Sequence, residues 1–220
     1  MKSIDRILKC VDFIYHMEML GGEPFLYKHL PAVMEKLAQT DRIFQIDVIT
    51  NGTVLPDKRL VPLLIRDNIC VVVNDYGAIS TKKDALLSLL NNAGIKSRMN
   101  KHWAWADLGG FAPRHRTETQ LTALFQQCNF KACAELLHGK LYRCPRSSHG
   151  TNTGLVPRDD NDYVKVCDES INVPELQGRI RHLFEDKKFL SACDYCDGNT
   201  SVSLMLEPAE QIVRTNGRVE

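Results

Sequence analysis

The chain of 220 residues carries 28 basic and 27 acidic side chains, so its formal net charge is +1. This balance gives no electrostatic reason to expect a nucleic-acid or anionic-membrane partner. The 44% apolar and 25% charged fractions are typical of a folded soluble protein with a real core. Apolar runs such as Ile69–Val73 are too short to span a bilayer. Because the first residues include Asp5, Arg6 and Lys9 and lack a signal-peptide pattern, we expect a cytoplasmic protein.

The first hundred residues alternate between helical and strand patterns. Apolar residues at helical spacing predict helices over residues 4–11, 30–37 and 84–93, and another beginning at Pro56. Short apolar runs predict strands at Met17–Leu20, Gln45–Ile49, Ile69–Val73 and Ile95–Met99. The step from strand to strand, about 25–30 residues, is that of a βαβ unit. The pattern therefore predicts an α/β fold with a parallel sheet that is buried on both faces.

Polar and glycine-containing segments follow the predicted strands. Ligands of parallel sheets bind at the carboxyl ends of the strands. These ends are Gly21–Pro24, Thr50–Thr53, Asn74–Gly77 and the residues from Asn100 onward. They form a candidate binding rim, although turn chemistry alone accounts for any one of them taken singly.

The residues after 100 contain six of the eight cysteines and few periodic apolar residues. We expect a core too small to hold this part by burial alone, and a metal centre can supply the missing stability. In a cytoplasmic protein, metal or cluster ligation explains such a cysteine count better than disulfides do. The six late cysteines are Cys128, Cys133, Cys144, Cys167, Cys193 and Cys196.

The spacing of these cysteines predicts a site with four thiolates. Cys193 and Cys196 form a C-x-x-C pair, which can bind one metal or cluster from a single turn. A hairpin at His138-Gly139 would return Cys144 to the side of Cys128 or Cys133, so two further ligands come from these three residues. Zinc and a [4Fe–4S] cluster both accept four thiolates, and the spacing does not choose between them.

The remaining cysteines have simpler interpretations. Cys10 and Cys70 lie within apolar patterns and are expected to be core thiols, and Cys167 a structural thiol. Arg146 and His149 follow Cys144 closely and could donate hydrogen bonds to the sulfur atoms of a cluster.

Four motifs, in order, resemble those of the radical S-adenosylmethionine superfamily, and the resemblance covers essentially the whole chain. Gly21-Gly22-Glu23-Pro24 matches the GGEP motif after the second barrel strand, and Ile49–Thr53 contains the TNG segment that closes the third. Val73–Gly77 resembles the polar end of the fourth strand. Cys128-x10-Gly139-x4-Cys144 followed by Cys193-x2-Cys196 is similar to the auxiliary-cluster extension called Twitch, a shorter relative of SPASM.

The resemblance implies a fold and a set of site residues. The fold would be a partial (β/α)6 barrel over residues 1–116, lacking its first strand, and a Twitch/SPASM-like auxiliary cluster domain over residues 117–220. Backbone and carboxylate acceptors of the GGEP segment would bind the methionyl ammonium of S-adenosylmethionine, and Asn74 its carboxylate or ribose. The implied cofactor-binding residues are Gly21, Gly22, Glu23, Pro24, Asn51 and Asn74, and the implied cluster ligands are Cys128, Cys133, Cys144, Cys193 and Cys196.

One defining element of the family is missing from the sequence. Its C-x3-C-x2-C loop holds the catalytic [4Fe–4S] cluster, yet only Cys10 precedes Gly21 here. The chain opens on the helix that would follow the first strand, which leaves an exposed sheet edge. A truncated chain explains this better than a degenerate paralogue would, since the GGEP residues are intact.

Two functions remain open from the sequence. The first is a radical S-adenosylmethionine enzyme, or a major fragment of one, that abstracts hydrogen from a small-molecule, sugar or peptide substrate. It would receive electrons from a donor such as flavodoxin or ferredoxin, and its catalytic cluster would need a missing N-terminal segment. The alternative is a non-catalytic scaffold or partner protein on a decayed barrel that binds only an auxiliary iron–sulfur cluster or zinc.

Overall fold

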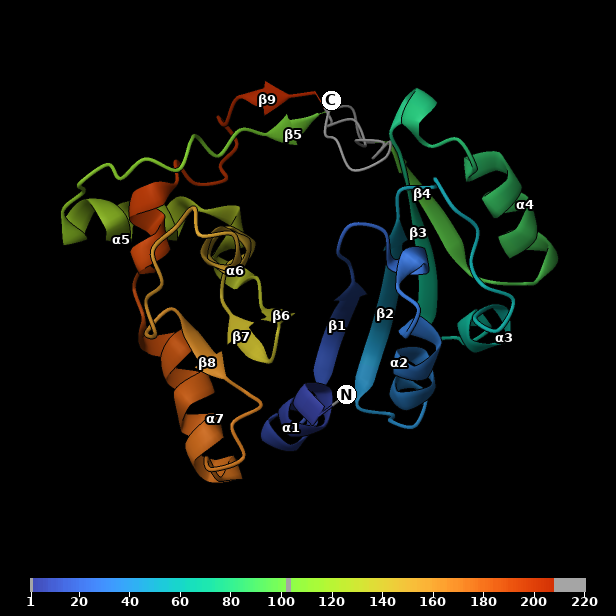
Figure 1. Cartoon of the computed structure of the whole chain (residues 1–220), viewed down its shortest axis with the longest axis horizontal. Coiled ribbons are helices and arrows are strands. Elements are labelled where there is room, and N and C mark those ends of the chain that lie inside the picture. The colour runs from blue at the N-terminus through green and yellow to red at the C-terminus, as the bar shows by residue number, and fades with distance from the viewer. Residues whose placement is uncertain (1, 102–103, 208–220) are drawn as a thin grey trace, which may run out of the picture. The chain divides into compact units, whose positions relative to one another are not determined.

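The computed structural model describes residues 2–101 and 104–207, and it is a mixed α/β structure (Figure 1). The chain divides into two compact units. The sheet unit is Phe13–Trp105, and the cysteine-rich unit combines the residues up to Asp12 with Ala106–Leu206. Within the described ranges, no helix is both long and apolar enough to cross a membrane.

The sheet unit is built on four parallel strands in the order β1-β2-β3-β4, as the sequence predicts. The strands are β1 (Ile14–Met19), β2 (Ile43–Thr50), β3 (Ile69–Asp75) and β4 (Ser97–Lys101). β1 begins three residues before the predicted strand, and β4 begins after Ile95, which is buried ahead of it. All four carboxyl ends therefore lie at one edge of the sheet.

Three helices lie on the same side of this sheet (Figure 1). They are α2 (Leu30–Leu37), α3 (Val61–Leu64) and α4 (Lys83–Asn92). Their fully buried residues include Met34, Leu64 and Leu86, and the strands contribute Val48 and Val71. The helix predicted from Pro56 is wrong in extent: α3 begins only at Val61 and has Pro62 in its first turn, the part of a helix that tolerates proline.

The other face of the sheet carries polar side chains beside buried apolar ones such as Ile43 and Val72, and its His16 and Arg98 are exposed, so the prediction of a sheet buried on both faces holds only in part. Side chains at paired positions of parallel strands share a face. Asp47 pairs with Glu18 of β1 and Cys70 of β3, and this face also carries His16 and Arg98. Asp47 is fully buried there.

The cysteine-rich unit combines helices with two small sheets. Its helices are α1 (Lys2–Cys10), α5 (Glu118–Gln127), α6 (Pro145–Asn152) and α7 (Val173–Arg181), the last continuing into a π-helical turn at His182–Asp186. An antiparallel sheet consists of β6 (Glu135–Leu137), β7 (Lys140–Tyr142) and β8 (Tyr163–Lys165), and β5 (Trp105–Ala106) pairs with β9 (Met205–Leu206).

The predicted hairpin at His138-Gly139 is present as the β6–β7 turn. Both residues have positive φ, 47° and 76°, which is the backbone of the tight two-residue turn that joins antiparallel strands. A Cβ at Gly139 would lie 2.8 Å from the sulfur of Cys167, so the close approach of β8's following segment also requires glycine.

The cysteine-rich unit has a hydrophobic core of its own. The buried cluster contains Cys10, Phe125, Leu141, Val156, Val164, Val166, Ile171, Leu176, Leu183, Leu190 and Ala192. The sequence does not reveal this core because its residues are distributed over several helices, short strands and loops with no sustained period.

Helix α1 belongs to the cysteine-rich unit, not to the sheet unit that the family resemblance implies. Arg6 Nη2 donates to the carbonyl of Ile171 at 2.6 Å, and Gln177 Nε2 donates to the carbonyl of Cys10 at 3.1 Å. The two compact units therefore have bounds different from the predicted 1–116 and 117–220.

Candidate metal centre

Four of the cysteines line a single pocket of the cysteine-rich unit. Cys128, Cys144, Cys193 and Cys196 line it, and none of the four is in a disulfide. The rest of the lining is mainly apolar and consists of Leu124, Phe125, Phe130, Leu190 and Ala192 together with Lys131, Arg146 and Gly198.

Helix ends and a short turn position the four thiols. Cys128 caps the C-terminus of α5, and Cys144 is the N-cap of α6, immediately before Pro145. Cys193 lies within a 3-10 helix, Ser191–Tyr195, and Cys196 directly follows it. Cys128 and Cys144 therefore lie at helix ends, where the backbone changes direction.

Backbone amides point at two of the sulfur atoms. The N–H of Asn199 donates to Cys128 Sγ at 3.4 Å, and the N–H of Gly198 donates to Cys196 Sγ at 3.3 Å. Hydrogen bonds of this kind stabilise thiolates and tune metal sites made of sulfur ligands. Cys144, the N-cap of α6, has no side-chain capping hydrogen bond.

The pocket is a costly place for an unpaired thiolate. Burial raises the pKa of Cys144 to about 12 and that of Cys193 to about 12, and it also raises the pKa of Cys196. Buried thiols of this kind keep their protons at neutral pH unless a cation replaces them.

The thiols are not arranged around a single ion. Among residues 2–101 and 104–207, no three His, Cys, Asp or Glu side chains lie close enough together to hold one metal ion. The pocket nevertheless brings Cys128 and Cys144 together with the late pair, as the hairpin prediction requires.

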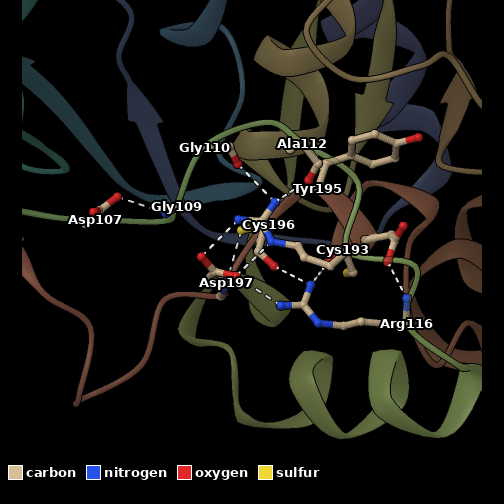
Figure 2. A network of polar contacts seen from close by, with 12 residues as sticks. Asp107, Gly109, Gly110, Ala112, Arg116, Cys193, Tyr195, Cys196 and Asp197 are labelled. Carbon is tan, nitrogen blue, oxygen red and sulfur yellow. Dashed lines mark hydrogen bonds and ion pairs between the residues drawn. The ribbon is translucent and has the colours of Figure 1, made fainter.

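A charged frame supports the C-x-x-C segment (Figure 2). Arg116 Nη1 donates to the carbonyls of Cys193 and Cys196 at 3.1 and 2.8 Å. Asp197 receives Arg114 Nε at 2.8 Å and Arg116 Nη2 at 3.0 Å. The sequence analysis did not foresee this frame, whose only signal was the run Arg114–Arg116.

The other predicted or considered cysteines lie elsewhere. Cys133 ends the 3-10 helix Asn129–Ala132 and is absent from the pocket lining. Cys10 is part of the buried core, Cys70 lies on β3, and the exposed Cys167 contacts Ser3 Oγ at 2.8 Å.

The GGEP segment follows β1 at the carboxyl edge of the sheet unit. Gly21 and Gly22 have φ of 111° and 51°, are exposed, and have open space where a Cβ would stand. Pro24 is buried and opens a 3-10 helix, Pro24–Leu26. The backbone of the two glycines is therefore accessible to a ligand.

Glu23 is buried and already engaged. Its Oε2 accepts from Thr50 Oγ1 at 2.9 Å and from the N–H of Asn51 at 2.8 Å, while Oε1 accepts from the N–H of Phe25 at 3.1 Å. The carboxylate thus joins the ends of β1 and β2.

The two asparagines predicted to bind a cofactor differ. Asn51 Oδ1 accepts from the N–H and hydroxyl of Thr53, which is a local turn contact. Asn74 Oδ1, near the end of β3, is buried and has no hydrogen-bond partner in the part of the chain that the structure describes. Of these two asparagines, only Asn74 therefore has a side-chain oxygen that is still available to accept a hydrogen bond from a ligand.

A polar group that the sequence analysis missed surrounds Asp47. Its carboxylate accepts from Gln45 Nε2 at 2.8 Å, Arg98 Nη2 at 2.6 Å and His16 Nε2 at 3.1 Å. The alternation of polar residues within Ile14–Met19 and Ile43–Thr50 was the available signal.

No protein-family model matches the chain, and no curated protein sequence matches it significantly.

Proposed function

We propose that the cysteine-rich unit binds a [4Fe–4S] cluster through Cys128, Cys144, Cys193 and Cys196. The observation that carries the proposal is that these four cysteines line one apolar pocket, with backbone amides directed at the sulfur atoms of Cys128 and Cys196. Four cysteine thiolates are the ligand set of a [4Fe–4S] cluster.

The spacing favours a cluster over zinc. A zinc ion needs its four thiolates at about 2.3 Å from one point. No described set of three candidate ligands is that close, whereas in a cluster each thiolate binds a different iron and the sulfur atoms stand farther apart. When bound, such a cluster accepts and donates single electrons.

We further propose that the sheet unit binds S-adenosylmethionine, which would make the protein a radical S-adenosylmethionine enzyme, or part of one, with the four-thiolate cluster as its auxiliary centre. The four parallel strands would then be part of a (β/α)6 barrel. The accessible backbone at Gly21-Gly22 and the unpartnered Asn74 Oδ1, both at the carboxyl edge, support this binding. An acceptor oxygen suits a ribose hydroxyl better than a carboxylate.

The hydrogen bonds that Glu23 already accepts limit its role in binding S-adenosylmethionine. Because its carboxylate already accepts three hydrogen bonds, the glycine carbonyls are the better acceptors for the methionyl ammonium. Hydrogen abstraction from a small-molecule, sugar or peptide substrate would also need a catalytic cluster, whose three thiolates are not among these residues. A flavodoxin or ferredoxin would supply the electrons.

Anaerobic reconstitution of the chain with iron and sulfide tests the cluster. We expect broad absorption near 400 nm and about four irons and four sulfides per chain. Serine variants of Cys128, Cys144, Cys193 or Cys196 should lose iron, while Cys133→Ser and Cys167→Ser should retain it. A colourless protein with one tightly bound zinc would contradict the cluster, and iron loss on Cys133→Ser would contradict the ligand set.

Equilibrium dialysis with S-adenosylmethionine tests the second site. Asn74→Ala should weaken binding by about tenfold, since one hydrogen bond to a buried partner is worth about 1 kcal/mol or more. Asn91→Ala, an exposed amide on α4, is the matched control and should change nothing. A chain that takes up the cluster but binds no S-adenosylmethionine would instead be the non-catalytic scaffold.

A further inference from the structure

Arg146 shares the pocket with the four thiols and is held rigidly there. It is the second residue of α6, directly after Pro145. Its guanidinium lies 3.7 Å from the ring centroid of Phe111, and Nη2 donates to the carbonyls of Gly109, Gly110 and Tyr195. The aromatic contact and the three carbonyls together restrict the orientation of the guanidinium.

One donor of this guanidinium is unused. Nε of Arg146 is buried and lacks a hydrogen-bond partner among the residues described. An unpartnered buried N–H of a charged group is costly, because its hydration is lost and nothing replaces it. An anionic group in the pocket would remove this cost.

A neighbouring arginine provides the contrast. Arg143 stacks on Phe125, and its donors reach the carbonyls of Lys131, Leu183 and Lys187. It is absent from the pocket lining. Arg143 therefore has a structural role that its contacts explain, whereas the contacts of Arg146 leave Nε unexplained.

We propose that Arg146 Nε–H donates a hydrogen bond to a sulfur of the group bound by the four thiolates and that Arg146 thereby sets its reduction potential. This role rests on the proposed cluster. Four thiolates around an iron–sulfur core form an anion, and one-electron reduction adds a further negative charge. A fixed cation and N–H donor in an apolar pocket stabilise that added charge and raise the potential.

The electron balance is simple. One electron passes from an external one-electron donor to the cluster, no bond is made or broken, and Arg146 keeps its proton throughout because a guanidinium does not titrate in this range. Arg146 is thus a positioning and tuning residue.

A redox titration of the reconstituted full chain tests the role. Arg146→Gln should lower the midpoint potential by at least a tenfold change in the reduction equilibrium, about 59 mV for one electron. Arg146→Lys keeps the positive charge but lacks Nε, so its midpoint potential should lie between those of the wild type and Arg146→Gln. Arg179→Gln, which removes an exposed arginine paired with Glu175, is the control and should leave the potential unchanged.

A spectroscopic measurement reports on the hydrogen bond directly. With arginine labelled with ¹⁵N only at Nε, pulsed EPR of the reduced cluster should detect a nitrogen coupling that disappears in Arg146→Lys. If Arg146→Gln does not retain a cluster, the potential and the nitrogen coupling are measured on Arg146→Lys instead. A potential equal to that of the wild type, or a coupling that persists in Arg146→Lys, would then overturn the role.

Failure of the proposed cluster binding and failure of the proposed role of Arg146 give different results. A wild-type chain that takes up no cluster contradicts the proposed function and this role with it. A wild-type cluster whose potential is the same in Arg146→Gln, at equal iron content, contradicts the role of Arg146 alone.

Discussion

The carboxylate of Glu23 accepts a hydrogen bond of 2.9 Å from the hydroxyl of Thr50, so that the segment after β1 is tied to the last residue of β2. The same oxygen accepts from the N–H of Asn51. Glu23 therefore fixes the relative position of two neighbouring strand ends, where the candidate cofactor rim lies.

Replacing Glu23 with alanine should destabilise this edge of the sheet. Buried donors at Thr50 and Asn51 would lose a charged acceptor, which costs about 2 kcal/mol or more in unfolding free energy. Denaturant unfolding and faster deuterium exchange at the Asn51 amide would measure the effect. Glu35→Ala, on the exposed face of α2, is the control; equal losses in both variants would mean that the strand ends do not depend on Glu23.

Asp47 should make the sheet unit sensitive to acid. Burial acts to raise the pKa of this carboxyl, but the hydrogen bonds that it accepts from Gln45, Arg98 and His16 outweigh burial, so the pKa lies below its ordinary value. A depressed pKa means that the stabilisation is present above about pH 4, the unfolded value, and is lost as the pH falls through the folded value.

Asp47→Asn should therefore lower the unfolding free energy at pH 7 by about 2 kcal/mol, and the difference from wild type should shrink towards pH 3. Urea unfolding between pH 3 and 7 measures both effects. Asp67→Asn, which alters a fully exposed carboxylate, should show no such trend. A difference that stays constant across this range would show that the Asp47 charge is not what stabilises the sheet.

Local sequence patterns were sufficient to predict the strands of the sheet, but not which surface each helix packs against. Apolar periodicity located the four parallel strands because each strand or helix carries its own period. It could not assign α1, since the apolar stripe of an amphipathic helix does not say which surface it packs against. The contacts that decide the question, Arg6 with Ile171 and Cys10 with Gln177, join residues more than 160 positions apart.

The candidate metal centre was predictable in part for the same reason. The C-x-x-C pair and the turn at His138-Gly139 are local features, so Cys144, Cys193 and Cys196 could be grouped from the sequence. The choice between Cys128 and Cys133 depends on the direction taken by the intervening 3-10 helix, and only the structure gives that direction. The unpartnered Nε of Arg146 likewise has no sequence signal.

Two adjacent glycines should differ sharply in their tolerance of alanine. Gly109 has φ of 72°, and a Cβ there would overlap with the carboxylate of Asp197 and the guanidinium of Arg114. Gly110 has open space at that position. Gly109→Ala should lower stability by at least about 2 kcal/mol, from backbone strain and the displaced ion pair, and Gly110→Ala should be nearly neutral.

Thermal unfolding of the two glycine variants and their iron retention after reconstitution provide the measurements. Because Asp197 follows Cys196 directly, displacement of its side chain should also speed the loss of iron in Gly109→Ala. Similar melting temperatures for the two variants would mean that the segment relaxes without cost.

Arg116 should govern how long the C-x-x-C segment retains the proposed cluster. Its Nη1 donates to the carbonyls of Cys193 and Cys196, and Nη2 donates to Asp197, so that one side chain holds three residues of the turn (Figure 2). Arg116→Gln removes the fork geometry and leaves two part-buried carbonyls without their donor, at about 1 kcal/mol each.

Iron transfer from reconstituted Arg116→Gln to a chelator should accordingly be about tenfold faster than from the wild type, because the loosened turn releases its two thiolates more often. Arg116→Lys retains the positive charge but not the paired donors, so its rate of iron transfer should lie between those of the wild type and Arg116→Gln. Arg59→Gln, which removes an exposed arginine of the sheet unit paired with Asp57, should match the wild type. Equal transfer rates for Arg116→Gln and Arg59→Gln would show that the thiols hold their positions without the arginine.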